Sequence, residues 1–83
     1  MATMAEPTPG QAHTIRHSLG ITRAAKPYRN HYCIVLPGLE MEAYMDAMVA
    51  AGWMRRGIEE QYMRTYHVTE AGAAAVGAAL PTG

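Results

Sequence analysis

The order of residue patterns in the second half of the chain constrains the fold more than any other feature of this sequence. Residues 39–51 place apolar side chains at helical spacing, and Gly52 stands where a left-handed residue often ends a helix. Residues 53–58 and 62–68 have the composition of two strands. A last helix follows over 70–80, after a suitable N-cap residue. These patterns predict a helix, a β-hairpin and a helix, and we expect the hairpin to stack the last helix on the earlier one.

The first half of the chain predicts a further helix and a further strand. Residues 1–10 contain two prolines and a glycine and are expected to form a disordered tail. Residues 11–19 place apolar side chains on one helical face before Gly20. Residues 28–36 are rich in aromatic and β-branched types, which is typical of a strand. The prediction is therefore an α+β fold, with a single domain over residues 11–83 that holds about three helices, a hairpin wing and an additional N-terminal strand.

Three glycines carry specific expectations. Gly57 is expected in the connection of the hairpin, together with residues 59–61. Gly72 and Gly77 lie inside the predicted last helix, where a glycine costs about 1 kcal/mol relative to alanine. Their presence indicates that another part of the backbone approaches that helix closely.

The chain is short, with 83 residues and a single cysteine. One cysteine excludes an internal disulfide, and a small domain buries a modest share of its surface, so we expect a partner or a homodimer to contribute to stability. No apolar run is long enough to cross a bilayer, and the start of the chain lacks the apolar core of a secretory signal. We therefore expect a cytoplasmic protein with no membrane partner.

The formal net charge is zero, but the charges are unevenly divided. Residues 1–38 carry four Lys or Arg against one Glu, whereas residues 39–83 carry three Arg against six acidic residues. A dedicated nucleic-acid-binding domain is usually basic as a whole, so this balance disfavours that function. The basic residues are nevertheless candidates for contacts with phosphates or with an acidic partner; alternatively they are solvated charges that pair in part with glutamates. The candidates are Arg23, Lys26, Arg29, Arg55, Arg56 and Arg64.

An apolar stripe rich in methionine is a candidate protein interface. It runs along predicted helix 39–51 and into the strand that follows, and its simplest explanation is that it belongs to the core. Methionines also line adaptable protein-binding surfaces, so an exposed part of the stripe would serve as an interface. The stripe consists of Met41, Tyr44, Met45, Met48 and Met54.

The remaining polar residues do not predict catalysis. No nucleophile–base arrangement, phosphate-cradling glycine loop or spaced pair of carboxylates is apparent, so neither enzyme activity nor a cofactor is expected. His13 and His17 face the same side of a helix, but a stable zinc site needs a third protein ligand, so no metal is expected. Cys33 is expected to be a buried structural thiol. Residues 28–31 either form a functional cluster or hold a strand edge by side-chain hydrogen bonds.

The second half of the chain resembles the winged-helix family. The matching segments are Gly52-Trp53-Met54-Arg55-Arg56 and Tyr66-His67-Val68-Thr69-Glu70-Ala71-Gly72. The resemblance spans residues 40–80 and implies a small domain with a β-wing of a kind that often binds nucleic acid. This chain departs from the pattern in two ways. A strand precedes helix 39–51 where a helix-turn-helix has a supporting helix, and that helix carries no Arg, Lys, Asn or Gln to reach base edges.

Almost the whole chain beyond residue 12 also resembles a group of small proteins encoded by bacteriophages and prophages. The matching segments of the first half are Ile15-Arg16-His17-Ser18-Leu19-Gly20 and Pro27-Tyr28-Arg29-Asn30-His31. The resemblance implies a mobile-element origin and a bacterial host cell. We therefore expect a non-enzymatic binding module that docks on a host or phage protein, such as a defence complex, and modulates or inhibits it. The alternative is a winged-helix transcriptional regulator that binds nucleic acid.

Overall fold

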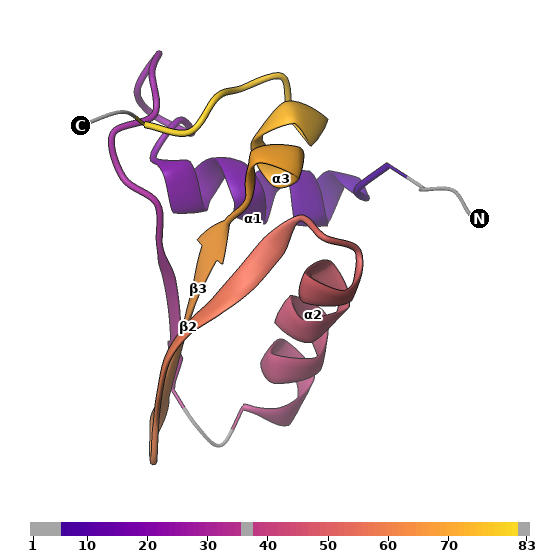
Figure 1. Cartoon of the computed structure of the whole chain (residues 1–83), viewed down its shortest axis with the longest axis vertical. Helices are drawn as coiled ribbons and strands as arrows, with labels where there is room; N and C mark the ends of the chain where they lie inside the picture. The colour runs from indigo at the N-terminus through magenta and orange to yellow at the C-terminus, as the bar shows by residue number, and fades with distance from the viewer. Residues whose placement is uncertain (1–5, 36–37, 82–83) are drawn as a thin grey trace.

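The computed structural model describes residues 6–35 and 38–81, and Figure 1 shows how its elements are arranged. Within these ranges the chain forms three helices and a three-stranded antiparallel sheet, which confirms the coarse α+β prediction. In chain order the elements are α1 (Pro9–Leu19), β1 (Tyr32–Val35), α2 (Leu39–Ala50), β2 (Met54–Glu60), β3 (Met63–Val68) and α3 (Glu70–Ala75).

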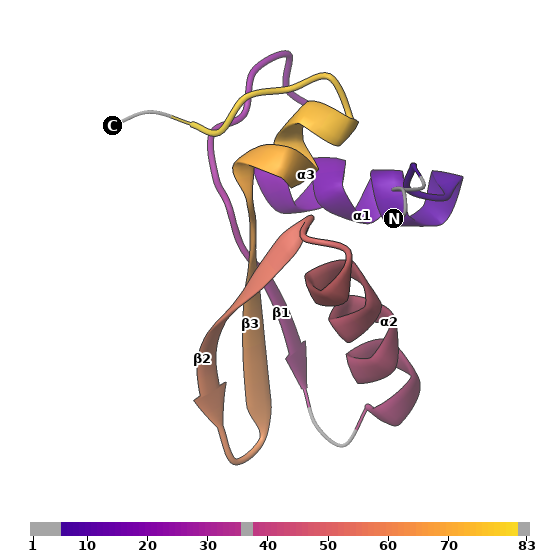
Figure 2. The ribbon, with the colours of Figure 1, turned by 45° about the vertical axis from the view of Figure 1, so that its right-hand side comes forward.

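The sheet is built around β3, which pairs antiparallel with β1 on one side and with β2 on the other. α2 lies along one face of the sheet, while α1 crosses the end of the sheet and α3 lies over α1 (Figures 1 and 2). All of these elements contribute to one buried cluster between the layers. Its members are Ile15, Leu19, Ile34, Met45, Met48, Trp53, Met54, Tyr66, Val68 and Ala73.

α1 begins earlier than the sequence predicts. Thr8 accepts a hydrogen bond from the N–H of Gln11 (3.1 Å), and the Gln11 side chain accepts one from the N–H of Thr8 (2.9 Å), which is a capping box. Pro9 then occupies the first helical position, where its missing N–H costs nothing. The predicted tail is therefore wrong at Thr8–Gly10, and its residues 1–5 lie outside the described residues.

β1 is shorter than the predicted strand, whose last residue lies outside the described ranges. Residues 28–31 run beside the end of α1 instead, and the N–H of His31 donates to the carbonyl of Ser18 (3.1 Å). Asn30 takes over the pairing with β3. Its side-chain amide accepts from the N–H of Val68 (2.6 Å) and donates to the carbonyl of Val68 (3.0 Å). Residues 28–31 were expected either to form a functional cluster or to hold a strand edge by side-chain hydrogen bonds. The bonds of Asn30 to Val68 match the second expectation.

β2 extends two residues past its predicted end, and β3 begins one residue later than predicted, so residues 61–62 alone connect the two strands. Gly57, which the sequence places in the connection, lies within β2 at a β-bulge, where the register against β3 shifts. A β-carbon at Gly57 would lie 2.5 Å from Nε2 of His67 and 2.6 Å from Oγ1 of Thr65. The N–H of Ile58 donates to the same Thr65 oxygen (2.7 Å). The bulge therefore depends on a glycine and a threonine that face each other across the hairpin.

α3 ends well before residue 80, the predicted end of the last helix. Gly77 ends it in the left-handed conformation (φ 72°), and the N–H of Ala78 donates back to the carbonyl of Ala73 (2.8 Å). A β-carbon at Gly77 would meet nothing within 4 Å, so the expected close approach is wrong there. The expectation is confirmed at Gly72, where the carbonyl oxygen of Trp53 occupies the space that a β-carbon would need.

α3 packs mainly on α1 and on β3 (Figure 2). The expectation that the last helix stacks on α2 is therefore wrong. The reason is geometric: β3 delivers the chain to the end of the sheet that α1 crosses, whereas α2 runs along a face of the sheet.

Candidate binding surfaces

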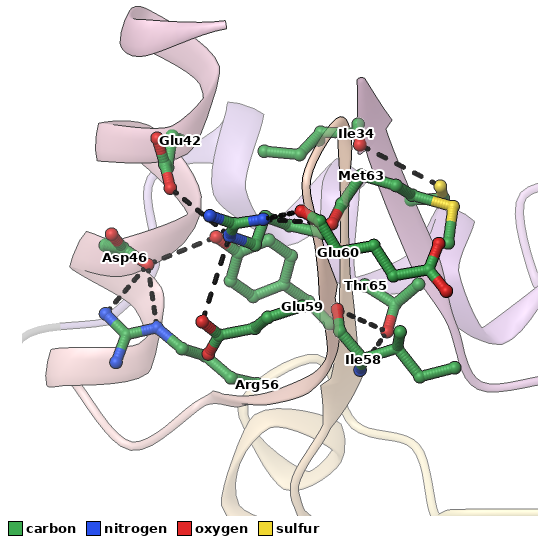
Figure 3. Close-up of polar contacts among 12 residues, drawn as sticks. Ile34, Glu42, Asp46, Arg56, Ile58, Glu59, Glu60, Met63 and Thr65 are labelled. Atoms are coloured by element: carbon green, nitrogen blue, oxygen red, sulfur yellow. Dashed lines mark hydrogen bonds and ion pairs between the residues drawn. The ribbon is translucent and has the colours of Figure 1, made fainter. Parts of the chain in front are cut away.

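Asp46 of α2 joins two residues of the sheet face that α2 covers (Figure 3). One of its carboxylate oxygens lies 3.1 Å from a guanidinium nitrogen of Arg56 and accepts a hydrogen bond from the hydroxyl of Tyr66 (3.2 Å). The hydrogen bond and the charge of Asp46 raise the pKa of Arg56. Burial raises the pKa of Tyr66, and the charge of Asp46 raises it further. Asp46 thus favours the protonated form of both residues and orients both towards α2.

Arg64 of β3 is held by carboxylates and by backbone (Figure 3). Its Nε lies 3.7 Å from a carboxylate oxygen of Glu42 and 3.9 Å from one of Glu59, and its Nη1 donates to the carbonyl of Glu60. The Arg64 side chain is 24% exposed. Both Arg56 and Arg64 were candidates for contacts with phosphates or an acidic partner, and both pair with acidic residues of the chain, which is the alternative that the sequence left open.

The other four basic residues lie apart from this pair. Arg55 is exposed on the opposite face of β2, because successive strand residues point to opposite faces. Arg23 and Lys26 are exposed in the connection between α1 and β1. Arg29 donates from Nε (3.1 Å) and from Nη2 (2.7 Å) to the carbonyl of His17, in the last turn of α1. The six basic candidates are therefore distributed over separate parts of the molecule and do not form one surface.

Two hollows adjoin each other between the last turns of α1 and the connection to β1. They have volumes of about 450 and 310 Å³, and both are lined by His17 and Arg29. Among the described residues, no carboxylate lines either hollow. We call the two together the basic hollow and define it by His13, His17, Arg23, Tyr28, Arg29 and His31.

The predicted methionine interface lies mostly in the core. Met45 and Met48 are fully buried and Met54 is 2% exposed, so the interface prediction is wrong for these three residues. The reason is that α2 turns this part of the stripe onto the sheet. Met41 is 40% exposed and Tyr44 is partly buried, which leaves these two residues of the stripe accessible to a partner.

The sequence patterns did not identify the sheet face opposite α2 as a candidate binding surface. The register pairs Cys33 with Thr65 and Val35 with Met63, and alternation places all four on the face that points away from α2. Ile58, in the bulge of β2, is 57% exposed, and Val35 is 74% exposed. No described helix covers this side of the hairpin in Figure 1. We call these five residues the open sheet face.

Cys33 is exposed, so the prediction of a buried thiol is wrong. Only Ile34 is buried in β1, because α2 covers a single face of the sheet and the neighbours of Ile34 point to the other face. A signal was present in the sequence. If Ile34 faces the core, the period of two places Cys33 outside.

The histidines take part in ring contacts and in one backbone contact. The rings of His13 and His17 stack with centroids 6.4 Å apart, and His17 meets Tyr32 edge-on at 5.9 Å. Nδ1 of His67 lies 2.7 Å from the carbonyl oxygen of Asn30. Among the described residues, no group of three or more His, Cys, Asp or Glu side chains is placed to hold a metal ion.

Within residues 6–35 and 38–81, no helix combines the length and the apolar character that crossing a membrane requires. Comparison of the chain with protein-family models, with curated proteins and with solved structures finds no match.

Proposed function

We propose that the protein is a non-enzymatic binding module that docks on another protein through the open sheet face. The observation that carries this proposal is a group of large, exposed apolar side chains. Val35 and Ile58 on that face are 74% and 57% exposed, and Tyr62 at the tip of the hairpin is 65% exposed. Single exposed apolar residues are common on protein surfaces, whereas a group of them is typical of a protein-binding surface.

Near the hairpin tip, the charge on this face favours a partner whose surface is apolar and basic. Arg55 lies on the same side of β2 but at the other end of the strand, opposite His67. Glu60 pairs with Met63 across the hairpin, so its carboxylate belongs to the open side of the sheet. The positive charges of Arg56 and Arg64 are already matched by acidic residues on the other side. Complementary charge steers association and excludes wrong partners, so Lys or Arg around an apolar patch is the expected chemistry of the partner.

The free edge of β1 supports docking of an extended segment. The N–H of His31 points to α1 and away from β3, and alternation along the strand directs the N–H groups of Cys33 and Val35 the same way. β1 carries no charged residue, whereas the β2 edge carries both Arg and Glu, which disfavour strand pairing. A strand from the partner, or β1 of a second copy in a homodimer, fits this edge.

The cellular setting of the proposal comes from the resemblance of residues 15–20 and 27–31 to phage and prophage proteins. We propose that the protein acts in the cytoplasm of a bacterial host. There it would modulate or inhibit a host or phage protein, such as a component of a defence complex. A winged-helix relationship would supply the scaffold for this docking rather than a DNA-reading helix.

The test compares two double variants that add the same charge. Val35→Glu with Ile58→Glu places two carboxylates on the open sheet face, and Ala74→Glu with Ala79→Glu places two at exposed positions in and after α3. Proteins captured from bacterial lysate by the unmodified protein are identified by mass spectrometry, purified, and titrated against each folded variant by calorimetry. We expect saturable binding to the unmodified protein and to the α3 variant. Binding to the open-face variant should be at least about tenfold weaker. Equal affinity of the two variants would contradict the proposal, as would the lack of any purified protein that binds saturably.

The alternative is a winged-helix regulator that binds nucleic acid. Two features of the fold favour it: the chain order β1, α2, β2, β3 with β1 beside β3, and a hairpin that projects from the body as a wing would (Figure 2). The basic residues Arg23, Lys26 and Arg29 also favour it. It ranks second because α2 is acidic, and because residues 36–38 are too few for the supporting helix of a helix-turn-helix. We expect no mobility shift of duplex or single-stranded DNA with micromolar protein at low salt. A shift that disappears with Arg23→Gln and Lys26→Gln would place this alternative first.

A further inference from the structure

The basic hollow gathers positively charged side chains. The last turns of α1 and the connection that follows, which line it, lie at the end of the molecule opposite the hairpin tip (Figure 2). Two guanidinium groups and three imidazole rings line it, and no carboxylate among the described residues does so. We infer that this hollow binds the phosphate group of a nucleotide. The inference does not depend on docking through the open sheet face. Cys33 belongs to that face and also lines the smaller hollow, but Val35 and Ile58, the two residues varied in the docking test, line neither hollow.

Arg29 is held in place before any ligand arrives. Two of its N–H groups, on Nε and Nη2, donate to the carbonyl of His17 at 3.1 and 2.7 Å. A guanidinium has five N–H groups, so three remain for a ligand. Because the side chain is already ordered, little conformational entropy is lost when those groups bind an anion. Arginine also matches the geometry of phosphate oxygens better than lysine does.

The imidazole rings extend the set of donors along α1. His13 and His17 are one helical turn apart, and their rings stack with centroids 6.4 Å apart. Each ring has an N–H that can donate to a phosphate oxygen. Arg23 lines the same hollow from the connection that follows α1. Donors from two segments of the chain therefore converge on one concave surface.

Tyr28 makes a nucleotide a better fit than an isolated phosphate ion. Its ring is 64% exposed at the hollow, and the guanidinium carbon of Arg29 lies 5.5 Å from the ring centroid. Gly20 allows the ring to lie there, because a β-carbon at Gly20 would come within 2.7 Å of Cζ of Tyr28. An exposed aromatic ring beside phosphate donors is a surface on which a nucleobase stacks. A hollow of about 450 Å³ is within the range of small-ligand sites.

The first experiment titrates ¹⁵N-labelled protein with AMP, adenosine and inorganic phosphate, followed by NMR. We expect AMP to shift amide signals of residues 13–31, and to bind at least about tenfold more tightly than adenosine, because adenosine lacks the charged group. Inorganic phosphate should shift the same signals with weaker affinity. If AMP binds no more tightly than adenosine, or shifts signals outside the hollow only, the inference is wrong.

Two matched variants test whether the charge of Arg23 contributes to AMP binding. Arg23→Gln removes one positive charge from the hollow, and Arg55→Gln removes one from the opposite face of the hairpin. We expect AMP to bind about tenfold more weakly to Arg23→Gln and with unchanged affinity to Arg55→Gln. Equal weakening in the two variants would assign the effect to net charge and would overturn the site. Val35→Glu with Ile58→Glu should leave AMP binding unchanged, so this result is separate from the docking test.

A free nucleotide and the end of a nucleic-acid strand present the same phosphate chemistry. A trinucleotide with and without a 5′ phosphate separates these two sources. Tighter binding of the phosphorylated trinucleotide than of AMP would assign the ligand to a strand end, and the reverse order would assign it to a free nucleotide. Equal binding of the two trinucleotides would overturn phosphate recognition.

Discussion

Arginine has opposite surroundings at the two ends of this molecule. At the hairpin end, Arg56 and Arg64 lie 3.1 and 3.7 Å from carboxylates of α2. At the α1 end, Arg23 and Arg29 line a hollow that no carboxylate lines within the described residues. A formal net charge of zero therefore conceals an uneven distribution, in which the two arginines that face α2 are paired with carboxylates and the two at the hollow are not. The comparison teaches that the element an arginine faces decides its role, rather than the number of arginines in the chain.

The largest expected effect comes from breaking the link between the two ends. Asn30→Ala leaves the N–H and the carbonyl of buried Val68 without their side-chain partner. We expect the free energy of unfolding to fall by about 2–4 kcal/mol, since each unsatisfied buried backbone group costs about 1–3 kcal/mol. Urea unfolding followed by Trp53 fluorescence measures it, with exposed Thr22→Ala as the control. A loss below about 0.5 kcal/mol would show that other contacts attach the basic hollow to the sheet.

A pH titration sharpens the description of the hairpin end. Burial and Asp46 raise the pKa of Tyr66, so the folded state holds the phenolic proton more tightly than the unfolded state does. Stability from this source is complete below the ordinary tyrosine pKa of about 10 and is lost as pH rises above it. Tyr66→Phe should lower the free energy of unfolding by about 1 kcal/mol at pH 7 and flatten its decline above pH 10. Exposed Tyr62→Phe should leave both quantities unchanged; an unaltered decline in Tyr66→Phe would assign the alkaline effect to another group.

The smallest expected change in stability belongs to the ion pairs themselves. Glu42→Gln with Asp46→Asn should cost about 1 kcal/mol or less, because ion pairs that remain accessible to solvent contribute little. The same change frees Arg56 and Arg64, so we expect weak, salt-sensitive binding of single-stranded DNA to appear, measured by fluorescence anisotropy.

Glu40→Gln with Glu70→Gln is the matched control for that double variant. It removes the same charge at exposed positions without releasing either arginine. If the control gains DNA binding to the same extent, net charge explains the effect, and the contrast between paired and available arginines does not hold.

Local patterns predicted much of the fold. α2 begins at the predicted residue, and its buried side chains, Met45 and Met48, have helical spacing. Thr69 caps α3 as predicted, because its hydroxyl accepts from the N–H of Gly72 (3.0 Å). These features depend on residues within a turn or two of one another, so a single segment of sequence contains the whole signal.

The features that the sequence did not reveal depend on residues far apart in the chain. Asn30 replaces a strand pairing only because Val68 lies opposite it, 38 residues later. The bulge at Gly57 requires Thr65 across the hairpin. The same contrast between local and long-range signals applies to the candidate binding residues. Basic residues were identified individually, but their roles as paired or available charges follow from which side of the sheet α2 covers.

The exposure of Cys33 makes the molecule a convenient sensor of its own docking. It is the one cysteine of the chain, and it lies on the open sheet face. A maleimide dye would attach at this single position without any engineering, and its emission would change as a bound protein excluded water from it. The same thiol would join two copies under oxidising conditions, so a reducing buffer keeps that surface accessible during purification.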